Sequence, residues 1–278
     1  MSAGLPRLTQ ARAPLLQAVQ VVNERGEVQQ LQIPAERALT LYVDKRELVT
    51  LMTLGAHPEW MVLGYLLNQQ LIASASDVES ITVDWEVGAA GIHTHRGITD
   101  LAAKTATRVV TTGCGQGSMF GDLLDSVSRR ALPPTTVTPQ MLQSITETIR
   151  QQDSVYKQAG SVHGCALFSG GELQLFVEDV GRHNAIDTLA GWMALQQRPV
   201  EQGVLYTTGR LTSEMVMKAA TMGIAVVVSR SGITHMGLSL AQSLGVCAIG
   251  RALHQRFLCY CGHERLLFAP QHRAVTVA

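Results

Sequence analysis

One cysteine of this chain stands in a setting that favours sulfur chemistry. Cys114 lies in the stretch Thr-Thr-Gly-Cys-Gly-Gln-Gly-Ser at residues 111–118, among three glycines. Glycines let the backbone turn sharply and leave room for a bulky partner to approach the sulfur. A helix is predicted directly after this stretch, and N–H groups of the loop and the helix start favour the nucleophilic thiolate. We therefore predict a nucleophilic thiol on a glycine loop, the alternative being a turn cysteine without a role.

The predicted loop holds no second thiol. Gly117 occupies the third position after Cys114, so the chain has no Cys-x-x-Cys motif there. That absence excludes a dithiol redox cycle within the loop and leaves a single sulfur that carries a group covalently.

Three arginines follow three successive predicted strands. Arg210, Arg230 and Arg251 each stand beside small residues at such a strand end, and we call this set the arginine rim. Ligands of open parallel sheets bind outside the carboxyl ends of the strands, where helix N-termini also face anions. Three guanidinium groups there suit a phosphorylated ligand, each charge-assisted hydrogen bond contributing about 1.5–3 kcal/mol. The alternative is three surface ion pairs worth about 0–1 kcal/mol each. Because the three arginines occupy matching positions at the strand ends, we favour a bound phosphorylated ligand over three separate surface ion pairs.

In the second half of the chain, predicted strands and helices alternate regularly, and these elements position the arginine rim. Strands are predicted over 204–207, 224–229 and 246–250, and helices over 213–222 and 235–244, each helix closed by a glycine. Strands that alternate with helices through short links form right-handed crossovers and a parallel sheet. The fold class of this half is therefore α/β.

The first half reads as α+β. A polar lead-in of about 35 residues contains a turn at 23–27 between short strands, and strands follow over 39–44 and 81–87. A helix is predicted after Pro58, where apolar residues fall at helical spacing. Pro133 and Pro134 give the clearest break, so we predict two domains, 1–135 with the cysteine loop and 136–278 with the arginine rim.

The amino-acid composition limits the kinds of partner and the cellular compartment that we expect for this protein. The 278 residues carry 22 basic and 22 acidic side chains, and this zero net charge argues against binding nucleic acid or an anionic membrane through the whole surface. No stretch is apolar for long enough to serve as an export signal or a membrane span. Five cysteines without disulfide-rich spacing indicate a reducing cytoplasm. The low share of charged residues, 16%, and the two-domain organisation make a homodimer the expected assembly.

Several stretches together resemble the FdhD family, the sulfur carrier proteins needed to make active formate dehydrogenase. They are the Cys114 loop, Glu-Asp-Val-Gly-Arg-His-Asn-Ala-Ile-Asp at 178–187, Thr-Gly-Arg at 208–210, Ser-Arg-Ser at 229–231 and Phe-Leu-Cys-Tyr-Cys-Gly-His-Glu-Arg at 257–265. They occur in order from about residue 39 to residue 265. The resemblance implies a cytidine-deaminase-like, three-layer α/β fold with a largely parallel sheet for the second domain.

The resemblance also implies a sulfurtransferase mechanism. A cysteine desulfurase hands sulfur to the loop cysteine, which holds it as a persulfide and passes it to the molybdenum bis(guanine dinucleotide) cofactor of formate dehydrogenase. Cys114 matches the family's persulfide cysteine, and the arginine rim could hold the pyrophosphates. The family's cofactor-binding stretch matches Phe257, Leu258, Cys259, Tyr260, Cys261 and Gly262. The cofactor is then a bound substrate, and no permanently bound metal is expected.

A zinc-dependent, deaminase-like hydrolase is the main alternative from another class. Such enzymes pair His-x-Glu with Pro-Cys-x-x-Cys, whereas this chain has only His163-Gly164-Cys165 and no Pro-Cys-x-x-Cys. Cys259-x-Cys261-x-His263 could place ligands at alternate strand positions, but three ligands this close seldom form a closed site, and core residues are the better interpretation. His93 and His95 are expected to be exposed to solvent rather than to bind metal.

Two further points stay open at the level of sequence. His183 and Asn184 either orient a ligand or, with Asp179 and Arg182, join a buried turn by hydrogen bonds. The chain could also be a guanine-nucleotide or molybdopterin-binding chaperone that makes no covalent sulfur transfer. It carries no Gly-x-x-x-x-Gly-Lys-Ser/Thr motif, which argues against hydrolysis of a nucleoside triphosphate.

Overall fold

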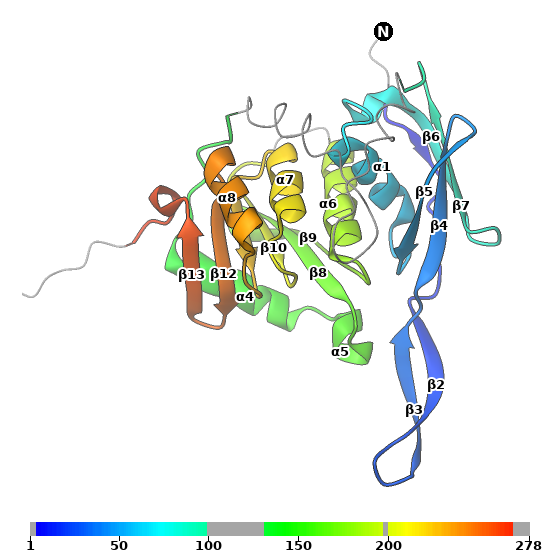
Figure 1. Ribbon diagram of the computed structural model, residues 1–278, viewed down its shortest axis with the longest axis horizontal. Coiled ribbons are helices and arrows are strands. Elements are labelled where there is room, and N and C mark those ends of the chain that lie inside the picture. The colour runs from blue at the N-terminus through cyan, green and yellow to red at the C-terminus, as the bar shows by residue number, and fades with distance from the viewer. Residues whose placement is uncertain (1–3, 99–130, 197–199, 269–278) are drawn as a thin grey trace, which may run out of the picture.

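The computed structural model describes residues 4–98, 131–196 and 200–268 (Figure 1). Cys114 and the helix predicted after it lie outside the described residues. Within the described ranges the chain forms two larger β-sheets and a projecting hairpin. No helix among the described residues has both the length and the apolar character needed to cross a membrane.

The first sheet has five strands in the order β1-β6-β7-β4-β5. Its core includes alternate apolar residues of the two predicted strands, Leu39, Leu41 and Val43 of β4 and Ile81 and Val83 of β6, packed with residues of the helix α1. The helix begins at Pro58, as predicted, because proline fits the first helical turn. The elements are β1 (Arg7–Leu8), β4 (Arg37–Val43), β5 (Arg46–Thr53), α1 (Pro58–Asn68), the short 3-10 helix η1 (Ala75–Asp77), β6 (Val78–Asp84) and β7 (Ala89–Thr94).

The polar lead-in is more ordered than the sequence indicates. It forms a hairpin of β2 (Leu16–Val22) and β3 (Val28–Pro34) that projects away from the two sheets (Figure 1). The predicted turn at 23–27 is confirmed. The Asn23 side chain accepts hydrogen bonds from the backbone N–H groups of Arg25 and Glu27, and Gly26 adopts a φ of 77° that suits glycine.

The second sheet has six strands in the order β13-β12-β11-β10-β8-β9. β10, β11 and β12 run parallel, as predicted, while β8, β9 and β13 extend the sheet with antiparallel pairings, so the sheet is mixed. Its strands are β8 (His163–Ser169), β9 (Glu172–Asp179), β10 (Gly203–Thr207), β11 (Val226–Ser229), β12 (Cys247–Leu253) and β13 (Arg256–Cys261).

Helices cover both faces of this sheet, which gives the three layers that the resemblance implied. Figure 1 shows α6, α7 and α8 on one face and α4 on the other, and two separate clusters of buried apolar side chains fill the two interfaces. The α/β class is confirmed. The helices are α4 (Pro139–Gln151), α5 (Val155–Ala159), α6 (Arg182–Gln196), α7 (Ser213–Thr221) and α8 (His235–Leu244), followed by the 3-10 helix η2 (His263–Arg265).

The two sheets are joined where α1 crosses α6 at the closest approach of their backbones. A Cβ on Gly64 would overlap the carbonyl oxygen of Asp187, and one on Gly191 would overlap that of Trp60. Two glycines on facing helices therefore let the main chains touch. The predicted domain boundary at residue 135 lies between β7 and α4 and stays a prediction.

Candidate functional site

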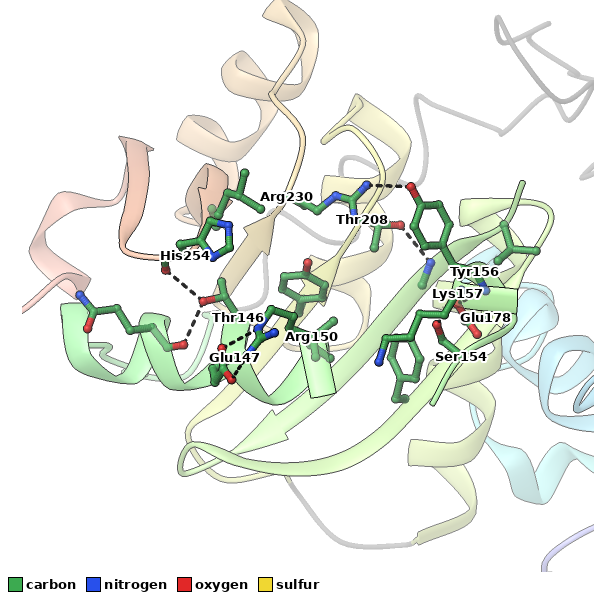
Figure 2. Close-up of a pocket in the computed structure, with 18 of the residues that line it drawn as sticks. Thr146, Glu147, Arg150, Ser154, Tyr156, Lys157, Glu178, Thr208, Arg230 and His254 are labelled. Carbon is green, nitrogen blue, oxygen red and sulfur yellow. Dashed lines mark hydrogen bonds and ion pairs between the residues drawn. The ribbon is translucent and has the colours of Figure 1, made fainter. Parts of the chain in front are cut away.

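A cavity of about 500 Å³ opens between α4, α5 and the carboxyl ends of β10 and β11 (Figure 2). We call it the α4–α5 pocket. Its apolar wall includes Val162, Phe176 and Tyr206. Its charged side chains are Arg150, Lys157, Arg230, Glu147 and Glu178. A concave site with aromatic walls and a few convergent charges is the usual form of a small-molecule pocket.

Helix capping fixes the two helices that line this pocket. The Thr138 side chain accepts a hydrogen bond from the Met141 N–H at the start of α4. Ser154 does the same for the Lys157 N–H at the start of α5. Glu178 adds a second cap, because its carboxylate accepts from the backbone N–H groups of Val155 and Tyr156. Glu178 therefore positions α5.

Arg230 lines the pocket with its guanidinium held against an aromatic ring. Its guanidinium lies 5.3 Å from the centre of the Tyr156 ring and donates to the Tyr156 hydroxyl at 3.5 Å. Arg150 is instead bound to Glu147 at 2.6 Å, and the hydrogen bonds from Arg150 and Gln151 lower the pKa of Glu147 to about 2. Across the ranges that the structure describes, no ion pair involves Arg210, Arg230 or Arg251.

The arginine rim is only partly as predicted. Arg210 and Arg230 follow β10 and β11 at the expected edge. The predicted end of the third strand at residue 250 is wrong, because β12 continues to Leu253 and pairs with β13, so Arg251 lies inside the strand at a bulge. Its backbone has a φ of 51°, and its N–H donates to the Ser231 carbonyl. The Arg251 side chain lines a second cavity, of about 670 Å³.

A different arginine completes the cationic edge. Burial, followed by the charges of Arg182, Arg210 and Arg230, lowers the pKa of His163 at the start of β8, so positive charge gathers around this histidine. Arg182 begins α6 and is buried. Sequence reasoning missed Arg182 as a member of this edge. The available signal was its position directly after a strand, the same signal that marked Arg210 and Arg230.

The predicted cofactor-binding stretch, Phe257 to Gly262, forms most of the edge strand β13 and the residue after it. Phe257 and Leu258 line the second cavity, and Leu258 is exposed. The Tyr260 ring packs on Gly250, where a Cβ would lie 2.8 Å from the ring. The α4–α5 pocket is lined by the turn just before this strand, at 253–255. A cofactor-binding role for the stretch stays a prediction.

The three buried cysteines of the described chain, Cys165, Cys247 and Cys261, do not offer a reactive thiolate. Burial raises the pKa of Cys165 to about 12, and its thiol lies 3.4 Å from the Thr207 hydroxyl. Cys247 and Cys261 are buried as well. Among the residues that the structure describes, no three His, Cys, Asp or Glu side chains are grouped so that they could hold a metal. His93 and His95 are exposed, as expected.

Two residues of the 178–187 motif fasten the end of β9 to the first sheet. The buried Asp179 carboxylate accepts from the Thr53 hydroxyl, the Leu54 N–H and the Asn184 amide, which also donates to the Met52 carbonyl at 2.7 Å. Of the two interpretations that the sequence left open, hydrogen bonding within a buried turn describes Asp179 and Asn184.

The rest of the motif enters a buried ionic network between α1, α6 and α7. Lys218 Nζ lies 2.7 Å from an Asp187 oxygen and 3.6 Å from a Glu214 oxygen, and Asn68 donates to the other Asp187 oxygen. Burial lowers the pKa of Lys218, but the two facing carboxylates raise it by more, so the amine stays charged. His183 Nε2 lies 3.3 Å from Glu214, and burial together with the charge of Lys218 lowers the pKa of His183 to about 2.

Comparison with known proteins finds a matching family and several similar chains. Residues 34–267 match the model of the FdhD/NarQ family. The chain is 31% identical over 250 residues to a protein of Bacillus licheniformis named "Sulfur carrier protein FdhD", covering 88% of this chain and 95% of that protein. A Bacillus subtilis protein of the same name is 28% identical, with 87% and 94% covered.

A solved structure shares the fold. It is the crystal structure of a putative formate dehydrogenase accessory protein from Desulfotalea psychrophila, with a TM-score of 0.75 and 26% sequence identity. The match covers 91% of this chain and 100% of that one.

Proposed function

Because this chain belongs to the FdhD/NarQ family, we propose that it is a sulfur carrier that serves formate dehydrogenase. The observation that carries the proposal is the family match over residues 34–267. It is supported by the names of the relatives, which are sulfur carrier proteins, and of the similar solved structure, a formate dehydrogenase accessory protein.

The sulfur is carried on Cys114 in this proposal, by a persulfide exchange. The Cys114 thiolate attacks the outer sulfur of a persulfide on a cysteine desulfurase, a new S–S bond forms, and the donor cysteine leaves as a thiolate. On delivery that S–S bond breaks and Cys114 becomes a thiol again. The two electrons that reduce the sulfur to sulfide come from the molybdenum centre that receives it.

The substrate that receives the sulfur is a molybdenum bis(guanine dinucleotide), and the α4–α5 pocket suits part of it. Phe176 and Tyr206 offer apolar surface to a flat base. Arg230 offers a guanidinium without a carboxylate partner in the described chain to a pyrophosphate. This combination supports nucleotide binding at the carboxyl edge of the sheet.

Activation of formate dehydrogenase in cells tests the proposal. In a bacterial strain that lacks its own sulfur carrier, expression of this chain is expected to restore formate dehydrogenase activity, and Cys114→Ala is expected to restore none. Cys165→Ala is the matched control, because it removes one thiol that is buried in the core and leaves Cys114 unchanged. Full activity with Cys114→Ala would contradict covalent transfer and favour a chaperone that only binds the cofactor.

A further inference from the structure

Two cysteines lie close together on neighbouring strands, away from the α4–α5 pocket. Cys247 on β12 and Cys259 on β13 have their sulfur atoms 3.9 Å apart. Cys247 is buried, whereas Cys259 is half-buried. Neither takes part in the sulfur transfer proposed above, which uses Cys114.

A β-bulge brings this pair onto one face of the sheet. Ile249 pairs with Cys259 and Ala248 pairs with Cys261, with a register shift between them. Because successive residues of a strand point to opposite faces, Cys259 shares its face with Ile249 and Cys247, while Cys261 lies on the other face. The two clusters of buried side chains show the same division, since Cys247 belongs to one and Cys261 to the other. The bulge therefore also prevents Cys259 and Cys261 from ligating one metal.

We propose that Cys247 and Cys259 form a reversible disulfide when the protein meets a peroxide. The half-buried Cys259 sulfur attacks the peroxide, the O–O bond breaks, and a sulfenic acid and one water form. Cys247 then attacks that sulfur, the S–O bond breaks, the S–S bond forms and a second water leaves. The two thiols lose two electrons in total, and the peroxide gains them.

Formation of the disulfide requires a small movement of Cys247 and Cys259 toward each other. The sulfur atoms must close from 3.9 Å to the bond length of about 2.05 Å. The bulge supplies the freedom, because the regular ladder of hydrogen bonds is interrupted beside Ile249.

The other two thiols among the described residues are placed less well to react. The Cys261 sulfur donates to the Val246 carbonyl at 3.3 Å, on the opposite face. Cys165 is fully buried on β8, which is separated from β12 by two strands in the sheet order.

Peptide mapping tests the proposal directly. Trypsin cuts after Arg230, Arg251, Arg256 and Arg265, so Cys247 falls in peptide 231–251 and Cys259 and Cys261 fall in peptide 257–265. The full chain is treated with hydrogen peroxide, its free thiols are blocked by alkylation, and it is digested without reductant. We expect the two peptides joined and lighter by two hydrogens, with alkylated Cys247 reduced at least tenfold. Dithiothreitol should restore the separate peptides.

Fragmentation of the joined peptide locates the link without any variant and so does not depend on how a variant folds. The link is expected at Cys259 in the natural chain and is expected to survive in Cys261→Ala. A link to Cys261 or to the Cys114 peptide, or an unchanged yield of alkylated Cys247, would overturn the proposal. None of these outcomes bears on the restoration of formate dehydrogenase, so the two proposals fail separately.

Discussion

At the scale of single residues, the guanidinium group of Arg230 distinguishes the α4–α5 pocket from an ordinary surface hollow. Arg150 is neutralised by Glu147, but Arg230 rests on an aromatic ring with no ion pair among the residues described. An unpaired cation held in place by a ring is ready to bind an anion, because little ordering remains to be done.

Arg230→Ala is expected to weaken binding of guanosine diphosphate, used as the probe, by roughly 10- to 150-fold. This range corresponds to about 1.5–3 kcal/mol for hydrogen bonds to a charged group. Arg251→Ala is the matched control and should change the affinity less than about twofold, because Arg251 lines the other cavity. Calorimetric titration at one fixed salt concentration measures both. Equal losses in the two variants would show that the pocket is not the nucleotide site.

The neutral His183 makes the stability of the protein depend on pH. Its pKa is about 2 in the folded state and 6.5 for the free side chain, so below pH 6.5 the unfolded chain binds a proton that the folded chain does not. Stability is therefore lost as pH falls. Between pH 7.5 and 5.5 this histidine should cost ~1.4 kcal/mol of unfolding free energy.

Urea unfolding of the natural chain and of His183→Gln at both pH values measures that contribution. The variant is expected to lose about 1.4 kcal/mol less than the natural chain over the interval, while His57 and His163, whose pKa values burial also lowers, remain in both. Parallel pH dependences would mean that His183 is already charged in the folded protein.

Some of the residues of the candidate site could be predicted from the sequence. Arg210 and Arg230 could be predicted because both end parallel strands, and parallel strands share one edge. Arg182 also follows a strand, but that signal alone did not place it at this edge, because its place depends on the antiparallel pairing of β8 with β9 and β10, which the sequence does not show. Asp179 was singled out by its motif, but its partners Thr53 and Leu54 lie about 125 positions away in the chain.

At the scale of elements, α1, α7 and α8 were predicted from the sequence, whereas α4, α5 and α6 were not. α8 spans His235–Leu244, the bounds predicted, because Gly245 ends it in a left-handed conformation. The bulge between β12 and β13 was not predictable, since no local signal says which residue of β13 lacks a partner. The register shift between Ala248 and Ile249 separates Cys259 from Cys261, and a second shift, between Gly250 and Leu253, places Arg251 inside the strand.

The α1–α6 crossing gives a sharp test at this scale. Gly64→Ala is expected to lower the free energy of unfolding by about 3 kcal/mol, because the new methyl group meets rigid main-chain atoms rather than a flexible side chain. Gly232→Ala is the control, since nothing lies within 4 Å of a Cβ at that position. Urea denaturation measures both. A Gly64→Ala protein as stable as the control would contradict the close crossing.

At the scale of the whole molecule, the two sheets are expected to unfold together. The α1–α6 crossing, the Asp179 hydrogen bonds and the Lys218 network all join elements of the first sheet to elements of the second, through buried contacts. Tryptophan fluorescence, from Trp60 and Trp85 near the first sheet and Trp192 on α6, and circular dichroism should give one coincident transition. Two separated transitions would show that 1–135 and 136–278 fold independently.

The central claim for the whole molecule is that sulfur travels on Cys114. The most direct measurement is the intact mass of the protein after incubation with a cysteine desulfurase and cysteine. The account predicts a gain of one sulfur atom that dithiothreitol removes and that Cys114→Ala does not show. A gain that persists in Cys114→Ala, or no gain in the natural chain, would contradict it.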